Sequence, residues 1–427
     1  MPETVKKFPG CHISFSAGFP KSEIDTCRSG YDIGMSRVQT GLEVLVETPE
    51  LVGGRRWALL ANQAAVTADL DPAREALHAA NLGDLIRLFA PEHGLDGVAQ
   101  DMEAVVDQQD PVTGAEVRSL YGADDRTLAP RPGDLDDVDV LVVDLPDIGT
   151  RYYTFAATMD WAMAAAERAG VEVVVADRPN PIGGVLREGG PVEPGFESFV
   201  SQLPVPVRHG LTLAEISLLL QRERYPDLEL TVVPGRGWKR EMWWDSTGLP
   251  WVPPSPNMPT LETAALYPGL CLIEATTLSE GRGTTRPFHL VGAPWVAAER
   301  LVEELRRLNL SGIAFRPTRF RPEFGKHAGS VCSGIELHIT DRRLLEPLAL
   351  GVHILKTIRD LHPEDFQWRP EPYEFVGDVP SIDLLTGSDD ARLAIEGQGS
   401  LDTMLENWSA SVADFAEGLG GVLLYHS

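Results

Sequence analysis

Short apolar runs alternate with stretches of helical pattern along the first half of the chain. Apolar runs of this length, bounded by polar or turn-forming residues, are typical of β-strands that are buried on both faces of a parallel sheet. We therefore expect strands at residues 57–61, 85–89, 138–143, 171–175 and 228–233.

The best-defined helical stretch covers residues 152–169, which are rich in alanine and methionine. Thr150 can cap its amino end, and Gly170 can end it. Strands that alternate with helices are typical of layered α/β folds. The pattern therefore predicts a Rossmann-like, doubly wound and mostly parallel sheet.

The pattern changes after about Trp238, where residues 243–259 are rich in tryptophan and proline. Proline disfavours regular helix and central strand, so we expect a crossing loop there. Beyond it, strands are expected at 271–275, 313–316 and 334–339, and helices at 346–361 and 403–418. This second pattern predicts a smaller α+β domain.

Three units follow from these patterns. Residues 1–35 show no period and form an N-terminal arm that is either disordered or not translated, because Met35 offers a later start. Residues 36–255 form the Rossmann-like catalytic domain, and residues 256–427 form the smaller auxiliary domain. We expect the active-site cleft between these two domains.

Charge and apolar content narrow the class of protein. Among 427 residues the net charge is −26, which repels phosphate backbones, so nucleic acid is not an expected partner. No apolar run is long enough for a membrane span, and the first 30 residues lack the apolar core of a signal peptide. We expect a cytoplasmic protein, with export left open and the oligomeric state undetermined.

Polar residues follow each expected strand of the first domain, where the ligands of open α/β sheets bind. The nucleotide, zincin and serine-esterase motifs GxGxxG, GxxxxGK[ST], HExxH and GxSxG do not occur, and the histidines show no metal-binding spacing, so no metal or cofactor is expected. Carboxylates, amides, tyrosines and arginines remain, which suits sugar binding and glycoside cleavage. They lie at Asn62 and Gln63, Glu92 and His93, Asp144 and residues 147–153, and Asp177 to Asn180.

An ordered series of motifs makes this chemistry more specific. The motifs are Ala-Asn-Gln at 61–63, Pro-Glu-His-Gly at 91–94, Asp-Ile-Gly-Thr-Arg-Tyr-Tyr-Thr at 147–154, Asp-Arg-Pro-Asn-Pro-Ile-Gly-Gly at 177–184, Pro-Asn-Met-Pro at 256–259 and Ser-Glu-Gly-Arg-Gly-Thr at 279–284. From about Val38 to its end, the chain resembles the bacterial exo-β-N-acetylmuramidases. The resemblance implies release of terminal β-linked N-acetylmuramic acid from the non-reducing end of peptidoglycan fragments, in a cleft between a Rossmann-like and a smaller domain.

The resemblance also implies that Glu92 is the catalytic general acid/base. A carboxyl group in a partly desolvated cleft has a raised pKa and can protonate a leaving glycosidic oxygen. His93 would tune it or hold substrate, and Asp147 is the expected second carboxyl, with Asp177 and Glu280 as alternatives. A third route uses the 2-acetamido oxygen of the substrate as nucleophile. The structural alternative for Glu92 is a cap on a helix that begins near residue 94.

Selective recognition of the lactyl carboxylate of muramic acid requires a cation or a helix N-terminus. We expect Arg151 in this role, with Arg178, Arg282 and Arg286 as competitors. Of the adjacent Tyr152 and Tyr153, at most one lines the cleft if both are helical, and Tyr152 is assigned to it. The other expected substrate-binding residues are Asn62, Gln63, Asp177, Arg178, Asn180, Asn257, Glu280 and Arg282.

Two other functions fit the same loops. One is a metal-dependent amide or ester hydrolase that acts on cell-wall fragments, which a metal requirement would reveal. The other is a muropeptide-binding protein without turnover, which would bind muramic-acid fragments and release no sugar.

Overall fold

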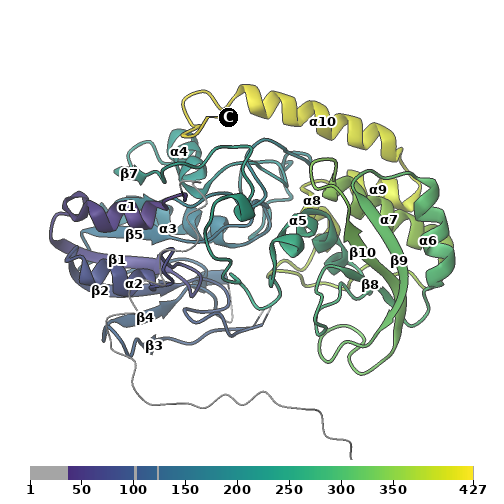
Figure 1. The fold of residues 1–427 in the computed structure, drawn as a ribbon, viewed down its shortest axis with the longest axis horizontal. Helices are drawn as coiled ribbons and strands as arrows, with labels where there is room; N and C mark the ends of the chain where they lie inside the picture. The colour runs from purple at the N-terminus through teal and green to yellow at the C-terminus, as the bar shows by residue number, and fades with distance from the viewer. Residues whose placement is uncertain (1–36, 101–102, 123–124, 427) are drawn as a thin grey trace, which may run out of the picture. The chain divides into compact units, whose positions relative to one another are not determined.

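The computed structural model describes residues 37–100, 103–122 and 125–426 (Figure 1). Residues Arg37–Ser427 form one compact unit. The expected arm at 1–35 and the alternative start at position 35 lie outside the described residues. No helix within the described ranges is long and apolar enough to cross a membrane.

A seven-stranded sheet forms the first part of the unit, in the order β3-β4-β2-β1-β5-β6-β7. Every pairing is parallel except that of β3 with β4 at one edge. The mostly parallel Rossmann-like sheet is thereby confirmed, and each of the five expected strands forms. The strands are β1 (Arg55–Ala61), β2 (Gly83–Ala90), β3 (Gln108–Gln109), β4 (Glu116–Ser119), β5 (Val140–Asp144), β6 (Glu172–Ala176) and β7 (Leu230–Val233).

Helices cover both faces of this sheet, because successive side chains of a strand point to opposite faces. On β1, Trp57 and Leu59 join the apolar core with α1 (Gly41–Glu47) and α2 (Ala73–Ala79). The intervening Ala58 and Leu60 join the core with α3 (Phe155–Ala169) and α4 (Leu213–Glu223). Two buried faces explain why the strands are continuous apolar runs.

The start of α3 differs from the expectation. The helix begins at Phe155, and the side chain of Thr150 does not cap it. Instead the backbone N–H of Arg151 donates to the carbonyl of Val207, and residues 151–154 form turns and a bend before the helix. The expected end is confirmed: Gly170 adopts the left-handed conformation, with φ of 67°.

The second part contains a three-stranded antiparallel sheet in the order β8-β10-β9, which confirms a smaller α+β domain. The expected strand at 271–275 is wrong: it is the 3-10 helix η4 (Cys271–Ala275), which continues from α5. A short apolar run does not distinguish a buried strand from a buried helical turn. The elements are α5 (Leu261–Leu270), β8 (Leu290–Ala293), α6 (Ala298–Arg307), β9 (Ile313–Phe320), β10 (Cys332–Ile339), α7 (Pro347–Leu361), α8 (Ser381–Thr386), α9 (Asp390–Glu396) and α10 (Leu401–Glu417), with further 3-10 turns η1 (Pro49–Leu51), η2 (Asp125–Thr127) and η3 (Trp244–Ser246).

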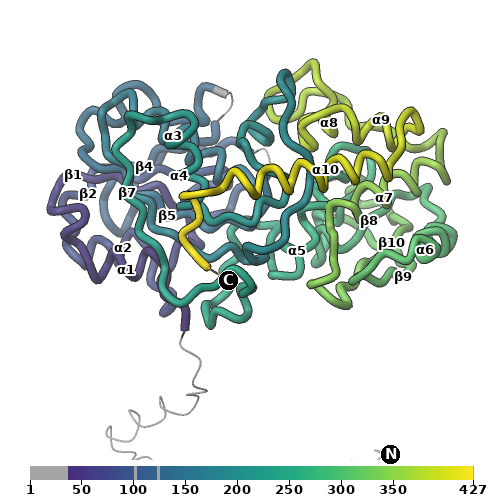
Figure 2. The backbone as a smooth tube through the Cα atoms, turned by 90° about the horizontal axis from the view of Figure 1, so that it is seen from above, coloured from purple at the N-terminus to yellow at the C-terminus, as the bar shows by residue number. Residues whose placement is uncertain are grey.

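The C-terminal segment returns to the first sheet. Figure 2 shows α10 running from α9 back toward α4, where Arg222 binds the carbonyl of Gly418 at 3.1 Å. Beyond it, the backbone N–H of Leu424 donates to Glu215 at 2.9 Å, and the hydroxyl of Tyr425 donates to Asp177 at 2.6 Å. The expected division between residues 255 and 256 stays a prediction, and the tail of the second part packs against the first.

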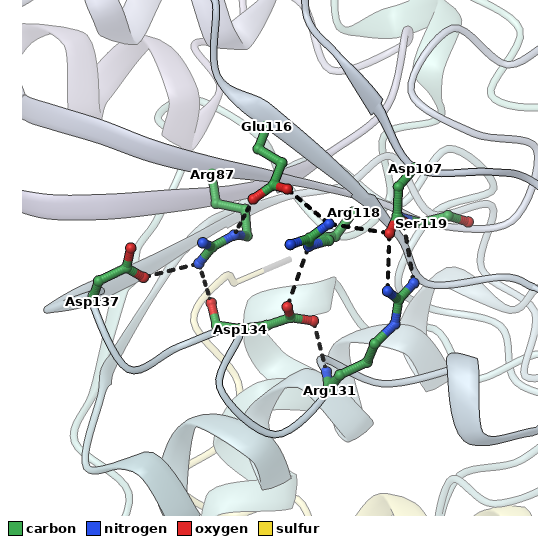
Figure 3. Close-up of polar contacts among 8 residues, drawn as sticks. All are labelled: Arg87, Asp107, Glu116, Arg118, Ser119, Arg131, Asp134 and Asp137. Carbon is green, nitrogen blue, oxygen red and sulfur yellow. Dashed lines mark hydrogen bonds and ion pairs between the residues drawn. The ribbon is translucent and has the colours of Figure 1, made fainter.

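A network of charged side chains ties β2 and β4 to residues 131–137 (Figure 3). Arg87 on β2 lies 3.0 Å from Asp137, and Arg131 lies 2.9 Å from Asp107. Burial alone would raise the pKa of Asp107, but hydrogen bonds and the charges of Arg131 and Arg118 lower it. The network fixes the segment beside β2, the strand whose carboxyl end leads into Glu92.

Candidate active site

The carboxyl group of Glu92 is held between two loops of the first sheet. Residues 92–97 form turns after β2, so Glu92 caps no helix there. Its side chain is buried, with 4% of its surface exposed, and Oε2 accepts a hydrogen bond of 2.7 Å from the hydroxyl of Thr154. Thr154 directly precedes α3, so that helix fixes the position of the carboxyl group.

His93 adopts a strained backbone conformation beside Glu92, with φ of 72°. Such a conformation costs a residue other than glycine on the order of 1–3 kcal/mol, and it occurs preferentially at functional sites. Its ring Nδ1 lies 2.9 Å from the carbonyl of Ala99, which orients the imidazole. His93 therefore reaches the same pocket as Glu92 in a fixed orientation.

Glu92 lines a pocket that we call the inner pocket. Its wall comes from loops of the first sheet and from the second part of the chain. Acids, hydroxyls, one amide and one guanidinium alternate there with aromatic rings. The lining residues are Glu92, His93, Tyr152, Tyr153, Thr154, Val200, Ser255, Asn257, Met258, Tyr267, Glu274, Arg282, Phe288, Tyr373 and Glu374.

A larger pocket, the outer pocket, borders the inner one and shares Asn257, Glu274 and Arg282 with it. Arg282 lies 2.9 Å from Glu274 and 3.7 Å from Glu280. Lys326 lies 3.0 Å from Glu280. Burial alone would raise the pKa of Glu280, but the charges of Lys326 and Arg282 hold it below its usual value.

Arg151 does not reach either pocket, which corrects its expected role with the lactyl carboxylate. Its side chain is fully buried, and the guanidinium donates to four backbone carbonyls at 2.9–3.1 Å. Burial lowers its pKa to about 10, so it stays charged near neutrality. Of the four expected arginines, Arg282 alone lines the inner pocket. The carbonyls belong to Gly190, Val205, Leu385 and Thr386.

Asp147 lies outside the inner pocket as well. Its Oδ2 accepts from the backbone N–H of Gly149 at 2.7 Å and lies 3.3 Å from Nε2 of His209. It lines a separate small cavity beside Trp244. Asp147 therefore stabilises its own loop and does not line the pocket that contains Glu92.

Several other expected residues stabilise loops. Asn62 and Gln63 donate to the carbonyls of Pro254 and Pro253, which attaches the proline-rich loop to β1. Arg178 makes a buried bidentate pair with Asp144 at 2.5 and 2.8 Å, which agrees with a structural role for that aspartate. Asn180 donates to the carbonyl of Leu211, and Arg286 contacts His289 and Glu336. None of these six residues lines the inner pocket.

Asp177 is buried behind the sheet and accepts from Tyr425 and from the backbone N–H of Ala214. Burial raises its pKa to about 7. The folded protein then binds a proton that the unfolded chain releases near pH 4, so this group contributes stability that is lost as pH rises from about 4 to 7. Between these pH values the free energy of unfolding falls by about 1.4 kcal/mol per pH unit from this group.

We expect Asp177→Asn to remove this loss, because an amide does not titrate. Urea unfolding at pH 5 and pH 7.5 checks it: the free energy of unfolding should fall less with pH in the variant than in the wild type. Parallel pH dependences would contradict the expectation.

Both adjacent tyrosines line the inner pocket, although only Tyr152 was expected to do so. Neither lies in α3, so both rings reach the inner pocket. The hydroxyl of Tyr152 donates to the carbonyl of Pro268, which links the turn before α3 to α5. The hydroxyl of Tyr153 is buried and has no hydrogen-bond partner in the described ranges of the chain.

Comparison with known proteins identifies the family. Residues 57–262 match the model described as exo-β-N-acetylmuramidase NamZ, N-terminal, and residues 265–425 match its C-terminal counterpart. The chain belongs to the exo-β-N-acetylmuramidase NamZ family.

Similar members of the NamZ family include a peptidoglycan β-N-acetylmuramidase of Bacillus subtilis (strain 168), which is 41% identical over 97% of this chain and 96% of its own length. Two solved DUF1343 family proteins of Bacteroides fragilis share the fold. One has a TM-score of 0.83 at 35% identity and covers 91% of this chain and 99% of its own. The other has a TM-score of 0.70 at 27% identity and covers 92% and 100%.

Sequence patterns missed part of the wall in this NamZ family member. Glu274 was hidden in the run expected as a strand, and Glu374 lies in a turn where its own φ is 44° and that of Phe375 is 69°. Ser255 directly precedes the Pro-Asn-Met-Pro motif that contains the expected Asn257, so that motif could have indicated it. No sequence signal indicated Glu374 or Tyr373.

Proposed function

We propose that this protein is an exo-β-N-acetylmuramidase that releases terminal β-linked N-acetylmuramic acid from the non-reducing end of peptidoglycan fragments. Membership of the NamZ family supports the activity. The observation that carries the mechanism is the buried carboxyl of Glu92, held at 2.7 Å by Thr154 in a pocket lined by rings and hydrogen-bonding groups.

Glu92 is the proposed general acid. Protonation of the leaving oxygen requires a carboxyl group in a fixed position within hydrogen-bond reach of it. The hydroxyl of Thr154 stabilises the carboxylate that forms after proton transfer, because a donated hydrogen bond favours the charged form. The same carboxylate can then take a proton from the attacking water.

The two pockets suit an exo-acting enzyme. The inner pocket holds the terminal sugar, and the adjoining outer pocket holds the rest of the fragment. Arg282, at the boundary between them, is the cation we assign to the lactyl carboxylate of the terminal sugar, with Asn257 as a hydrogen-bonding neighbour. This assignment replaces the expectation for Arg151.

Glu374 is the proposed second carboxyl. It is buried, with 4% of its surface exposed, and it lines the inner pocket with Glu92. Its strained backbone agrees with a functional position. Glu274 lines the same pocket, but Arg282 at 2.9 Å neutralises it.

One assay tests this function: initial rates on a chromogenic β-N-acetylmuraminide and on the matching glucosaminide, with and without chelator. We expect release from the muraminide that resists the chelator, with little release from the glucosaminide. Glu374→Gln in the same assay should lower the rate by about 10²-fold or more.

The same assay decides between the alternatives. Loss of activity with chelator would favour a metal-dependent hydrolase. Saturable binding of muramic-acid fragments without sugar release would favour a binding protein. The anomeric form of the first product distinguishes inversion from retention.

A further inference from the structure

Tyr153 presents a hydroxyl group to the inner pocket that the protein itself does not use. The residue is buried, with 5% of its surface exposed, and its ring lies 4.8 Å from that of Phe155 and 6.0 Å from that of Tyr267. Ser255 lies near enough to lower the pKa of Tyr153, but the hydroxyl meets the full geometry of a hydrogen bond with no residue in the described ranges. A buried unpaired hydroxyl is costly unless a ligand satisfies it.

The chemistry of this hydroxyl is that of a neutral donor. Burial raises the pKa of Tyr153 well above its usual value, and the nearby acids Asp147 and Glu92 raise it further. The same acids make the position unfavourable for an anion. A neutral acceptor such as a carbonyl oxygen therefore suits this position better than a lactyl carboxylate does.

Apolar side chains line the pocket together with this donor. Met258 and Phe288 are almost fully buried there, and Tyr267 packs edge-on against Phe288 at 4.9 Å. A wall of this kind suits a methyl group. Among the substituents of an N-acetylated sugar, the acetamido group combines a neutral carbonyl with a methyl.

We propose that Tyr153 and the wall of Met258, Tyr267 and Phe288 form the subsite for the 2-acetamido group of the terminal sugar, with the Tyr153 hydroxyl donating to the acetamido carbonyl. The assignment rests on the proposed function, since it places an N-acetylated sugar in the inner pocket. It makes Tyr153 a specificity-determining residue that reads the substituent at C2.

Calorimetric binding of two free sugars tests the subsite: N-acetylmuramic acid, and 3-O-(1-carboxyethyl)glucose, which has a hydroxyl at C2. The wild type should bind the first more tightly. Tyr153→Phe should weaken the binding of N-acetylmuramic acid by roughly 3- to 10-fold, which is the contribution of one neutral hydrogen bond. The affinity for the other sugar should change by less than about twofold.

Tyr152→Phe is the matched control, because its hydroxyl is bound to the carbonyl of Pro268. It should lower the melting temperature and leave the preference between the sugars unchanged. Equal weakening of both sugars by Tyr153→Phe, or the same change with Tyr152→Phe, overturns the subsite. If the wild type cleaves the muraminide, either of these results overturns only the acetamido subsite. If the wild type neither cleaves the muraminide nor binds N-acetylmuramic acid, both the subsite and the proposed function are wrong.

Discussion

Glu92→Gln is expected to lower kcat on a β-N-acetylmuraminide by about 10²- to 10⁴-fold, the usual contribution of a general acid. The amide keeps the shape of the side chain and can still accept the hydrogen bond from Thr154, but it cannot supply a proton. The loss should grow as the leaving group becomes more basic. It should be smallest with an activated phenol and largest with a natural sugar aglycone.

Rates on two aglycones, one activated and one a sugar, check this expectation. Thr154→Val is the control: it removes the 2.7 Å hydrogen bond to Glu92 but leaves the acid in place, so its loss should be smaller. Equal losses on both aglycones for Glu92→Gln would rule out proton donation by this residue. An unchanged melting temperature shows that the variant is folded.

Arg151→Met should destabilise the protein by about 3–5 kcal/mol, as the loss of one partner from a buried charged network does. Four carbonyls lose their donor at once, and they come from segments far apart in the chain, near Gly190, Val205 and Leu385. The free energy of unfolding in urea measures the effect. The preference for the muraminide over the glucosaminide should not change.

Arg282→Met provides the contrast. Its guanidinium lies at the boundary of the two pockets, so the muraminide should lose more activity than the glucosaminide. If Arg151→Met instead changed this preference and left stability intact, the original expectation for the lactyl carboxylate would be restored.

The fold could be predicted because burial on both faces of a sheet leaves a strong mark in the sequence. Strands such as β5 and β6 are fully buried apolar runs, and Gly170 marks the end of α3. The edge strand β3 and its neighbour β4 lack that pattern, since Gln108 and Gln109 are exposed and only two of the four residues of β4 are buried. Their pairing depends on contacts that no local pattern contains.

The site could be predicted less well, because a motif names residues without giving their directions. A three-residue error at the start of α3 misplaced the tyrosines: a helix separates neighbouring side chains, whereas the turn found here brings both Tyr152 and Tyr153 to the pocket. Arg151, in the same motif, is fully buried and does not line the pocket. Glu374 lies far from the other motifs in the sequence. Its carboxylate accepts a hydrogen bond from the hydroxyl of Tyr121, which is 253 residues earlier in the chain.

The hydrogen bond between Tyr425 and Asp177 has a consequence for biosynthesis. Tyr425 follows Asp177 by 248 residues, so it leaves the ribosome long after β6 and α4. During translation the emerging N-terminal half therefore lacks one of its own buried partners. A chain that stops before α10 leaves Asp177 without that partner.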